Sequence, residues 1–227
     1  MNKRTIIIGD VHGCLLELEA LLSKINYSPS GDQLYFTGDI INRGPYSKEV
    51  FNKVKSLQGR VVLGNHEHNL IRAFEGIGEP RKWIERFKRE YGSGLNELID
   101  DLKKWPFFIE EEDFILVHGG IVPGVPLVKT DPYILTNIRT WDGSGKNLKD
   151  PKNPPWFDLY REEKLVVFGH WAALEGVFRE NVIGLDSGCV YGKKLSALIF
   201  PNREIVQVSA AKAYCRIKKG MLPEQRL

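Results

Sequence analysis

Short apolar runs that end on a polar residue are the main pattern along this chain. The runs IIIGD, LYFTGD, VVLGN, ILVHG and VVFGH occupy residues 6–10, 34–39, 61–65, 115–119 and 166–170. Continuous apolar runs of this length, bounded by glycine, are typical of buried β-strands. Because a buried strand presents a polar side chain only where it ends, we expect these strands to bring polar residues to one edge of a sheet.

The first three predicted strands alternate with amphipathic helices. Leu15, Leu18, Leu22 and Ile25 recur at steps of three and four residues, which predicts one helix over residues 15–25. A second helix is predicted over residues 47–57. The resulting β-α-β-α-β order predicts three parallel, neighbouring strands.

The remainder of the chain predicts a mixed α/β domain. Residues 67–105 form an expected helical insertion, broken at 76–80 and at 92–94, and residues 110–113 an expected hairpin turn. The Pro-, Gly- and Asn-rich stretch 123–155 predicts loops with one short helix near 131–138. Short strands follow at 182–185, 195–200 and 204–208. We therefore expect a single α/β domain over residues 1–210, built from two packed mixed β-sheets flanked by helices, and a basic tail over 211–227.

Composition narrows the class of protein. The 227 residues are 42% hydrophobic and 27% charged with a net charge of +3, so neither disorder nor nucleic-acid binding is indicated. No apolar run approaches the roughly 18–20 residues that span a bilayer, and we expect a cytoplasmic protein without a membrane partner. The three cysteines are odd in number and far apart, so no disulfide framework is predicted.

The polar residues at the strand ends form a candidate metal site. Asp10 and His12 lie two apart in extended chain, so both side chains can reach one ion, and Asp39 ends a neighbouring strand. Asn65, His118 and His170 end three further strands and can serve a second ion. Carboxylate, imidazole and amide ligands suit Mn, Fe, Zn or Co and leave the choice among them open. Two ions sharing a carboxylate, about 3.5–4 Å apart, are suited to displacement at phosphorus.

Five short motifs in fixed order carry a resemblance to a known family. GDVHG, GD-x-x-x-RG, GNHE, HGG and GH resemble the motifs of the calcineurin-like metallophosphoesterases, in the branch that holds the phosphoprotein phosphatases. A closer likeness is to the symmetrical diadenosine tetraphosphate hydrolases. It is carried by the segments GDIINRGPYSKEV, VVLGNHEHNLIRAFEGI, FGHWAALEG and GLDSGCVYGKKLSAL.

The resemblance implies a role for each residue of the candidate site. Asp10, His12 and Asp39 resemble the ligands of a first metal ion, with Asp39 bridging, and Asn65, His118 and His170 resemble the other ligands of a second. It implies a general acid at His66 and phosphate-holding arginines at Arg43 and Arg139. It also implies two divalent ions, most simply Mn, with Fe, Zn, Co or Mg as alternatives, and the α-β-β-α fold of the family.

Asn42 departs from the protein phosphatases of this branch, which have an aspartate at that position. The diadenosine hydrolases also lack the acid, so Asn42 favours a dinucleoside polyphosphate, such as diadenosine tetraphosphate, as the substrate. A serine/threonine protein phosphatase or broad phosphomonoesterase using the same site is the alternative, and a non-catalytic scaffold is a second. The chain is shorter than expected for those hydrolases, and the missing part should lie in the loop-rich region.

Overall fold

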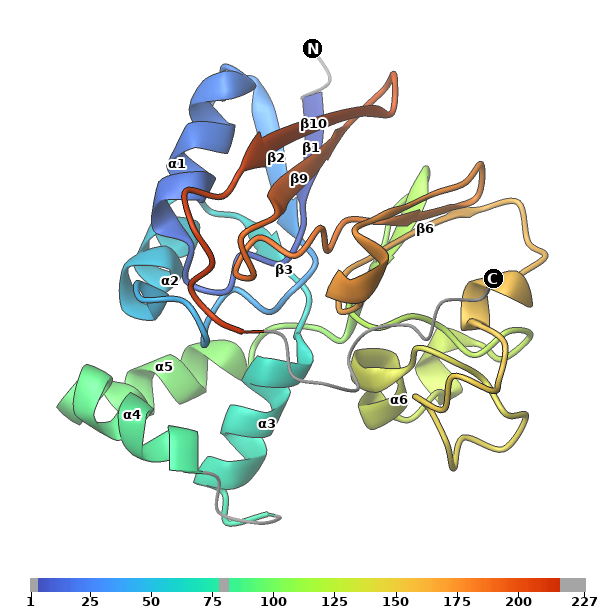
Figure 1. Ribbon diagram of the computed structural model, residues 1–227, viewed down its shortest axis with the longest axis horizontal. Coiled ribbons are helices and arrows are strands. Elements are labelled where there is room, and N and C mark those ends of the chain that lie inside the picture. Colours follow the sequence, from blue (N-terminus) through green and yellow to red (C-terminus); the bar gives the residue numbers. More distant parts are fainter. Residues whose placement is uncertain (1–3, 78–81, 217–227) are drawn as a thin grey trace.

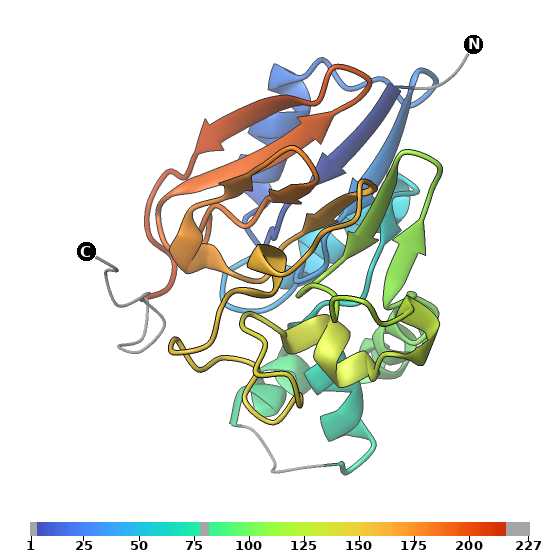
Figure 2. The same cartoon turned by 90° about the vertical axis from the view of Figure 1, so that its right-hand side faces the viewer.

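Two five-stranded β-sheets packed face to face form the centre of the molecule. The computed structural model describes residues 4–77 and 82–216. The strand order is β10-β9-β1-β2-β3 in the first sheet and β4-β5-β6-β8-β7 in the second. Figure 1 shows helices α1 and α2 on the outer side of the first sheet, and Figure 2 shows the helical insertion below the two sheets. The predicted fold class is confirmed.

The first sheet contains the predicted β-α-β-α-β unit. Its strands β1 (Arg4–Ile8), β2 (Asp32–Phe36) and β3 (Arg60–Val61) are parallel neighbours. Helices α1 (Leu15–Lys24) and α2 (Ser47–Ser56) join them. Strands β9 (Lys194–Ile199) and β10 (Glu204–Ser209) add to the other edge of β1 in antiparallel order.

The second sheet begins with the predicted hairpin. Strands β4 (Phe108–Glu110) and β5 (Phe114–Val117) pair antiparallel around the expected turn. Strands β6 (Leu165–Phe168) and β8 (Val182–Gly184) follow in parallel with β5. Strand β7 (Val177–Phe178) was not predicted, because two residues are too short for a periodic pattern.

Alternation along the central strand divides the core between the two faces of the first sheet. Ile7 packs in the cluster between the sheets, with Leu116 and Val167 of the second sheet. Ile6 and Ile8 point the other way and pack in the cluster that includes the helices. The central strand β1 is therefore buried on both sides, which explains why its run is continuously apolar rather than alternating.

The helical insertion consists of α3 (Asn65–Phe74), α4 (Lys82–Tyr91) and α5 (Leu95–Leu102), with a 3-10 turn at Gly92–Gly94. A short helix, α6 (Pro132–Asn137), lies in the loop-rich stretch as expected. Within the described residues no helix is long and apolar enough to cross a bilayer. The predicted break at residues 76–80 and the basic tail at 211–227 lie partly outside the described residues.

A forked ion pair at the start of β2 gives a pH-dependent prediction about stability. Arg4 donates to both carboxylate oxygens of buried Asp32 at 2.9 Å, and the Ser28 N–H donates at 2.8 Å. These bonds, chiefly that from Arg4, lower the pKa of Asp32 despite its burial. The stabilisation is therefore present above the unfolded pKa of about 4 and is lost as the pH falls through the lower folded value.

We expect Asp32→Asn to lower the free energy of unfolding by about 1–2 kcal/mol at pH 7, because Arg4 is partly exposed and the pair is partly screened. Urea unfolding at pH 7 and near pH 2.5 checks the prediction, since the difference from wild type should shrink as the pH falls below the unfolded pKa toward the lower folded value. Asp113→Asn, an exposed aspartate in the β4–β5 turn, is the control. A deficit that does not change with pH would contradict the ion-pair explanation.

Candidate metal centre

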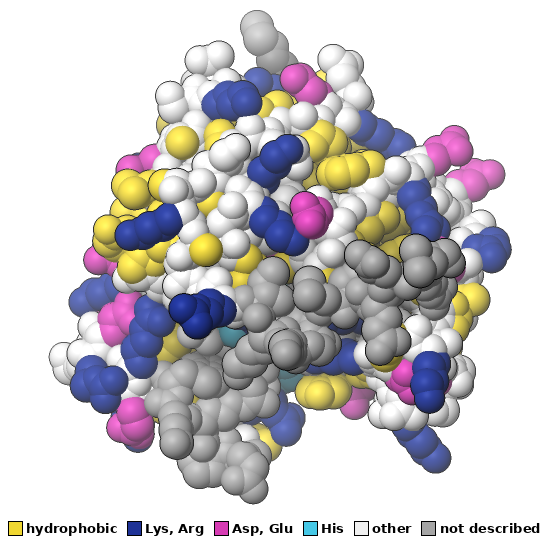
Figure 3. All heavy atoms as spheres, in the orientation of Figure 1, with side chains coloured by type: hydrophobic (Ala, Val, Ile, Leu, Met, Phe, Trp, Pro, Cys, Tyr) yellow, Lys and Arg dark blue, Asp and Glu magenta, His cyan; other side chains and the backbone are white. Residues whose placement is uncertain are grey.

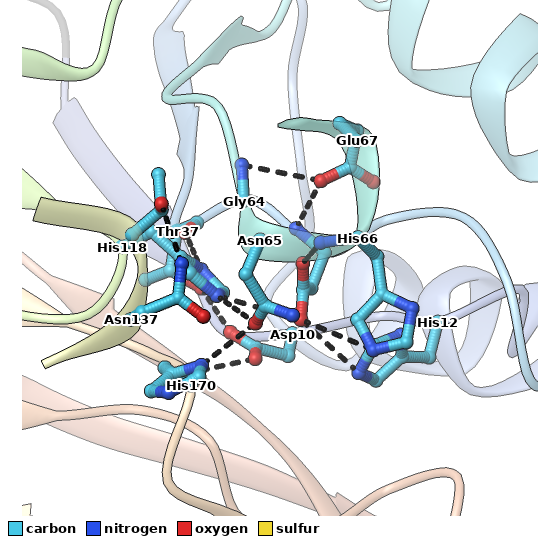
Figure 4. Close-up of polar contacts among 12 residues, drawn as sticks. Asp10, His12, Thr37, Gly64, Asn65, His66, Glu67, His118, Asn137 and His170 are labelled. Carbon is cyan, nitrogen blue, oxygen red and sulfur yellow. Dashed lines mark hydrogen bonds and ion pairs between the residues drawn. The ribbon is translucent and has the colours of Figure 1, made fainter. Parts of the chain in front are cut away.

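The predicted site residues lie together at one end of the two sheets. The loops after β1, β2, β5 and β6, the segment after α6 and the start of α3 bring in their side chains. Figure 4 shows a group of them gathered around a common centre: Asp10, His12, Asn65, His66, His118 and His170. Eight of the nine lie within one connected set of hydrogen bonds and ion pairs, and Arg139 joins it through the backbone of His170. They are Asp10, His12, Asp39, Arg43, Asn65, His66, His118 and His170.

Asp39 stands at the centre of this arrangement. Its Oδ2 atom lies 3.5 Å from Nε2 of His12 and 3.4 Å from Nε2 of His118. Its Oδ1 atom accepts a hydrogen bond from the backbone N–H of His66 at 2.8 Å. One carboxylate oxygen thus faces two imidazoles that come from different sheets, which is the position that a bridging ligand requires.

His12 is held in the form that binds metal. Its Nδ1 lies 3.1 Å from the carbonyl oxygen of Ile41, which can only accept, so Nδ1 carries the proton and Nε2 keeps its lone pair. Burial lowers the pKa of His12 well below its usual range. His12 is therefore a neutral imidazole, and the free lone pair on its Nε2 points toward Asp39.

His118, His170 and Asn65 form the second half of the site. Oδ1 of Asn65 lies 3.1 Å from Nε2 of His118 and 2.7 Å from Nδ1 of His170. Nδ1 of His118 donates to the carbonyl oxygen of Thr37 at 2.7 Å, which directs Nε2 toward the centre. The three predicted residues therefore converge with Asp39 on one position.

Asp10 takes a different place from His12 in this structure. Its Oδ1 accepts from the hydroxyl of Thr37 at 2.7 Å, and its Oδ2 accepts from the backbone N–H of His170 at 2.9 Å. Two tight donor groups lie at this site, His12 with Asp39 and His66, and Asp39 with His118 and His170, and Asp10 belongs to neither. Its predicted role as a ligand of the first ion stays a prediction.

The donor set fits two divalent cations. Nδ1 of His118 carries the proton that it donates to Thr37, so the lone pair of its Nε2 faces the amide oxygen of Asn65 at 3.1 Å, and two acceptors turned toward each other are expected of ligands around a cation. Although burial opposes a charge on His118, Asp39 and its other acceptors raise the pKa of His118 to about 10. The cluster of acceptors therefore requires positive charge, which a metal ion would supply in place of that proton.

The backbone around the site is held in an uncommon conformation. Nine described residues other than glycine have a positive φ, and five of them are His12, Asp39, Asn42, Arg43 and His170. Side chains disfavour this left-handed region, and such residues gather where a site requires them. Gly64 is required for a different reason, because a Cβ there would lie 2.3 Å from Oδ1 of Asp39. The loops are therefore shaped around these side chains.

Glu67 is a supporting residue that the sequence reasoning did not single out. It is fully buried, and its carboxylate accepts from the backbone N–H groups of Asp39, Ile41 and Gly64 at 2.9, 3.1 and 3.2 Å. Burial and the nearby Asp39 raise the pKa of Glu67 to about 8. Its position in GNHE, directly after the candidate ligand and acid, was the available signal. It fastens the loop after β2 to the first turn of α3.

His66, the predicted general acid, lies at the edge of the metal centre. Its ring meets that of His12 edge-on with 4.8 Å between centroids, and its Nε2 lies 4.0 Å from Oδ2 of Asp39. The side-chain amide of Asn42 lies 2.7 Å from Nδ1 of His66. Nε and Nη2 of Arg43 lie 3.2 and 3.0 Å from Nε2 of the same ring. Asn42 and Arg43 thus contact opposite nitrogens of one imidazole.

A cavity of about 260 Å³, here called the reaction cavity, opens onto the metal centre. Its wall includes both predicted arginines, and Arg139 donates to the carbonyl oxygen of His170 at 3.1 Å. Burial lowers the pKa of Arg139. Asp186 and Lys149 also line this cavity, and the sequence reasoning gave neither a role. Asp186 follows β8 in the segment GLD, so the rule of polar residues at strand ends could have found it.

Comparison with known proteins gives the family. The model of the family described as calcineurin-like phosphoesterase matches residues 3–205. The chain belongs to the calcineurin-like phosphoesterase family, as the five motifs indicated. The family uses a dinuclear metal site, and the Asp/His groups described above could hold metal.

Two curated relatives carry the same name, symmetrical bis(5'-nucleosyl)-tetraphosphatase. The protein from Vibrio campbellii is 32% identical over 88% of this chain and 97% of its own length. The protein from Vibrio parahaemolyticus is also 32% identical, with the same coverage. The alignment with the first runs over 259 residues, more than the 227 of this chain, so the relative has segments that this chain lacks.

A solved structure is similar over almost the whole fold. It is the crystal structure of a protein assigned as a candidate diadenosine tetraphosphatase, 29% identical to this chain with a TM-score of 0.81. The match covers 92% of this chain and 94% of the other. The similarity supports the two-sheet architecture described above and the membership in the family.

Proposed function

We propose that this chain hydrolyses dinucleoside polyphosphates at a two-metal site and splits diadenosine tetraphosphate symmetrically into two ADP. The observation that carries the chemistry is the single oxygen of Asp39 that lies 3.5 Å from His12 and 3.4 Å from His118. The substrate preference is supported by relatives named for that reaction, which this chain matches over 97% of their length.

The proposed ligands divide around Asp39. Asp10, His12 and Asp39 would hold one ion, and Asp39 with Asn65, His118 and His170 would hold the other. When bound, two divalent ions supply Lewis-acid stabilisation of the phosphoryl group and activate a water as the nucleophile. Manganese is our preferred metal, and the oxygen and imidazole donors also suit Fe, Zn, Co or Mg.

Arg43 and Arg139 would neutralise the charge that develops on the phosphoryl oxygens. Both line the reaction cavity, and a planar guanidinium can donate two parallel hydrogen bonds to one phosphoryl group. Donors fixed in a partly buried cavity stabilise such charge more than water does.

His66 would protonate the leaving oxygen. A guanidinium only donates, so the contacts of 3.0 and 3.2 Å from Arg43 occupy the lone pair of Nε2 on His66. A phosphate group is a stronger acceptor than a neutral imidazole, and it would draw Arg43 away from the ring. Nε2 would then be able to carry a proton toward the leaving group, as general acid catalysis requires.

Asn42 distinguishes the proposed function from the alternative function, that of a phosphomonoesterase or serine/threonine protein phosphatase. We expect Asn42→Asp to raise the ratio of aryl phosphate to diadenosine tetraphosphate turnover by about tenfold, because a carboxylate beside His66 stabilises its protonated form. Asp tolerates the positive φ of 71° at this position, so the turn should persist. Steady-state rates on both substrates check the prediction. An unchanged ratio would remove Asn42 as a determinant of substrate choice.

A substrate panel tests the proposed function. Purified, manganese-loaded protein is given diadenosine tetraphosphate, a phosphoserine peptide and a simple aryl phosphate at equal concentrations, and nucleotide products are separated by anion exchange. The proposal expects diadenosine tetraphosphate to be cleaved fastest with ADP as the nucleotide product. Intact diadenosine tetraphosphate together with rapid dephosphorylation of the peptide would instead favour a serine/threonine protein phosphatase.

A further inference from the structure

A second cavity lies beside the reaction cavity and shares one wall residue with it. This outer cavity of about 680 Å³ is lined by segments from α1, the β2–α2 loop, α4 and the chain that follows β10. Arg43 lines both cavities, so the two are neighbours across its side chain. Figure 3 shows only small areas of histidine side chain on this face of the molecule.

The reaction cavity alone is too small for a dinucleoside polyphosphate. Its volume of about 260 Å³ falls below the roughly 300–1,000 Å³ of sites that enclose a drug-sized ligand. Symmetrical cleavage leaves a nucleoside with two phosphates on each side of the broken bond. At least one of these halves must therefore extend beyond the reaction cavity.

The proton donor determines which half extends toward the outer cavity. The leaving oxygen must lie next to His66, the proposed acid, and Nε2 of His66 contacts Arg43 at 3.0 and 3.2 Å. A leaving group that starts at His66 therefore passes along Arg43. Arg43 therefore contacts the proposed acid, His66, and also lines the outer cavity.

The chemistry of the outer cavity suits a nucleoside diphosphate. Its described lining has three cations, Arg43, Arg86 and Lys212, and no carboxylate, although Arg86 pairs with Glu90 at 3.4 Å just outside it. Cationic side chains attract the phosphates. Tyr46 is 38% exposed, which offers an aromatic face on which a base can stack.

Fixed contacts hold the outer cavity in shape. Arg86 donates to the carbonyl oxygen of Gly44 at 2.7 Å, which ties α4 to the loop that carries Arg43. The hydroxyl of Tyr214 donates to buried Glu17 at 3.0 Å, and the backbone N–H of Ala211 donates to the same oxygen at 2.9 Å. The segment after β10, which Figure 1 shows running past α1, is thereby fastened as one wall.

We propose that the outer cavity binds the leaving nucleoside diphosphate half of the substrate, with Tyr46 beneath the base and Arg86 and Lys212 near the phosphates. The inference rests on the proposed function for the identity of the substrate. It adds a specificity site to the chemistry, because an aryl phosphate has neither a second phosphate nor a base to fill this cavity.

The test uses the double variant Tyr46→Ala/Lys212→Ala, with Lys48→Ala, an exposed lysine on α2 outside the lining of either cavity, as the control. For each protein, kcat/KM is measured on diadenosine tetraphosphate and on an aryl phosphate, together with the inhibition of aryl phosphate hydrolysis by ADP. We expect KM for diadenosine tetraphosphate and the inhibition constant of ADP to rise about tenfold in the double variant. The effect on the aryl phosphate should be several-fold smaller.

The two measurements separate this inference from the proposed function. If the wild type leaves diadenosine tetraphosphate intact but the double variant loses inhibition by ADP, the proposed function is wrong and the cavity still binds a nucleoside diphosphate. If ADP inhibits the wild type and the double variant equally, or does not inhibit the wild type, the inference is overturned whatever the tetraphosphate result.

A second variant covers the case in which the double variant is destabilised. If the double variant loses all activities and has a lower melting temperature, the ADP measurement is repeated with Tyr46→Phe/Lys212→Gln. That variant should keep stacking but weaken ADP binding, and equal inhibition would again overturn the inference.

Discussion

Replacing Asp39 with alanine should remove both the metal ions and the activity. Oδ2 of Asp39 faces the imidazoles of both halves of the site, so its loss takes a ligand from each ion at once. We expect the metal content to fall from about two ions per chain to below about one, and turnover of diadenosine tetraphosphate to fall at least about 10³-fold. Elemental analysis and steady-state rates on the same preparation measure both effects.

The control for this variant is Asp113→Ala, which removes an exposed aspartate from the β4–β5 turn. It should keep its metal and its rate. Oδ1 of Asp39 also accepts from the backbone N–H of His66, so the fold of the Asp39 variant is checked by its circular dichroism spectrum. A folded Asp39→Ala protein with unchanged turnover would refute the proposed mechanism.

Replacing His66 with alanine should slow the reaction and leave the metal bound. General acid catalysis contributes about 10²–10⁴-fold, so turnover of diadenosine tetraphosphate should fall by that range. Phenyl phosphate should lose more, because its phenolate leaving group is a stronger base than the leaving diphosphate and needs more help from an acid. Rates on the two substrates, measured at equal metal content, give the comparison.

His68 provides the matched control, since it lies two residues further along α3. Its Nδ1 lies 3.4 Å from the hydroxyl of Thr136, and its ring packs against Phe107, away from the metal centre. His68→Ala should therefore change turnover by less than about twofold, as expected of a residue outside the chemistry. Equal losses on both substrates after removal of His66 would contradict its role as the acid and indicate a structural one.

The strand ends were predictable because burial leaves a clear pattern in a sequence. Ile6 to Ile8 are apolar throughout since both faces of β1 are covered, and the first polar residue marks where the strand leaves the core. The same rule applies to Asp39 and Asn65, which follow the parallel strands β2 and β3 of the first sheet, and parallel strands end on the same side of a sheet. His118 follows β5 of the second sheet, so it reaches Asp39 only because the two sheets pack together. The roles of these residues came from the family motifs and remain predictions.

The walls of the cavities were not predictable in the same way. Lys149 lies in the loop-rich stretch, where no periodicity indicates which side chains turn inward. Arg86 reaches the loop at Gly44 only because α4 folds back across it, and Lys212 and Tyr214 arrive from beyond the last strand. Contacts between segments so far apart in sequence depend on the packing of the whole chain. No local spacing encodes them.

Asp39 would be a ligand of both metal ions, and anomalous diffraction from a manganese-loaded crystal tests this role most directly. Data collected above the manganese absorption edge locate each ion without reference to activity. We expect two peaks about 3.5–4 Å apart, one against Nε2 of His12 and the other against Nε2 of His118, with Asp39 between them. A single peak, or two peaks that do not share Asp39, would contradict it.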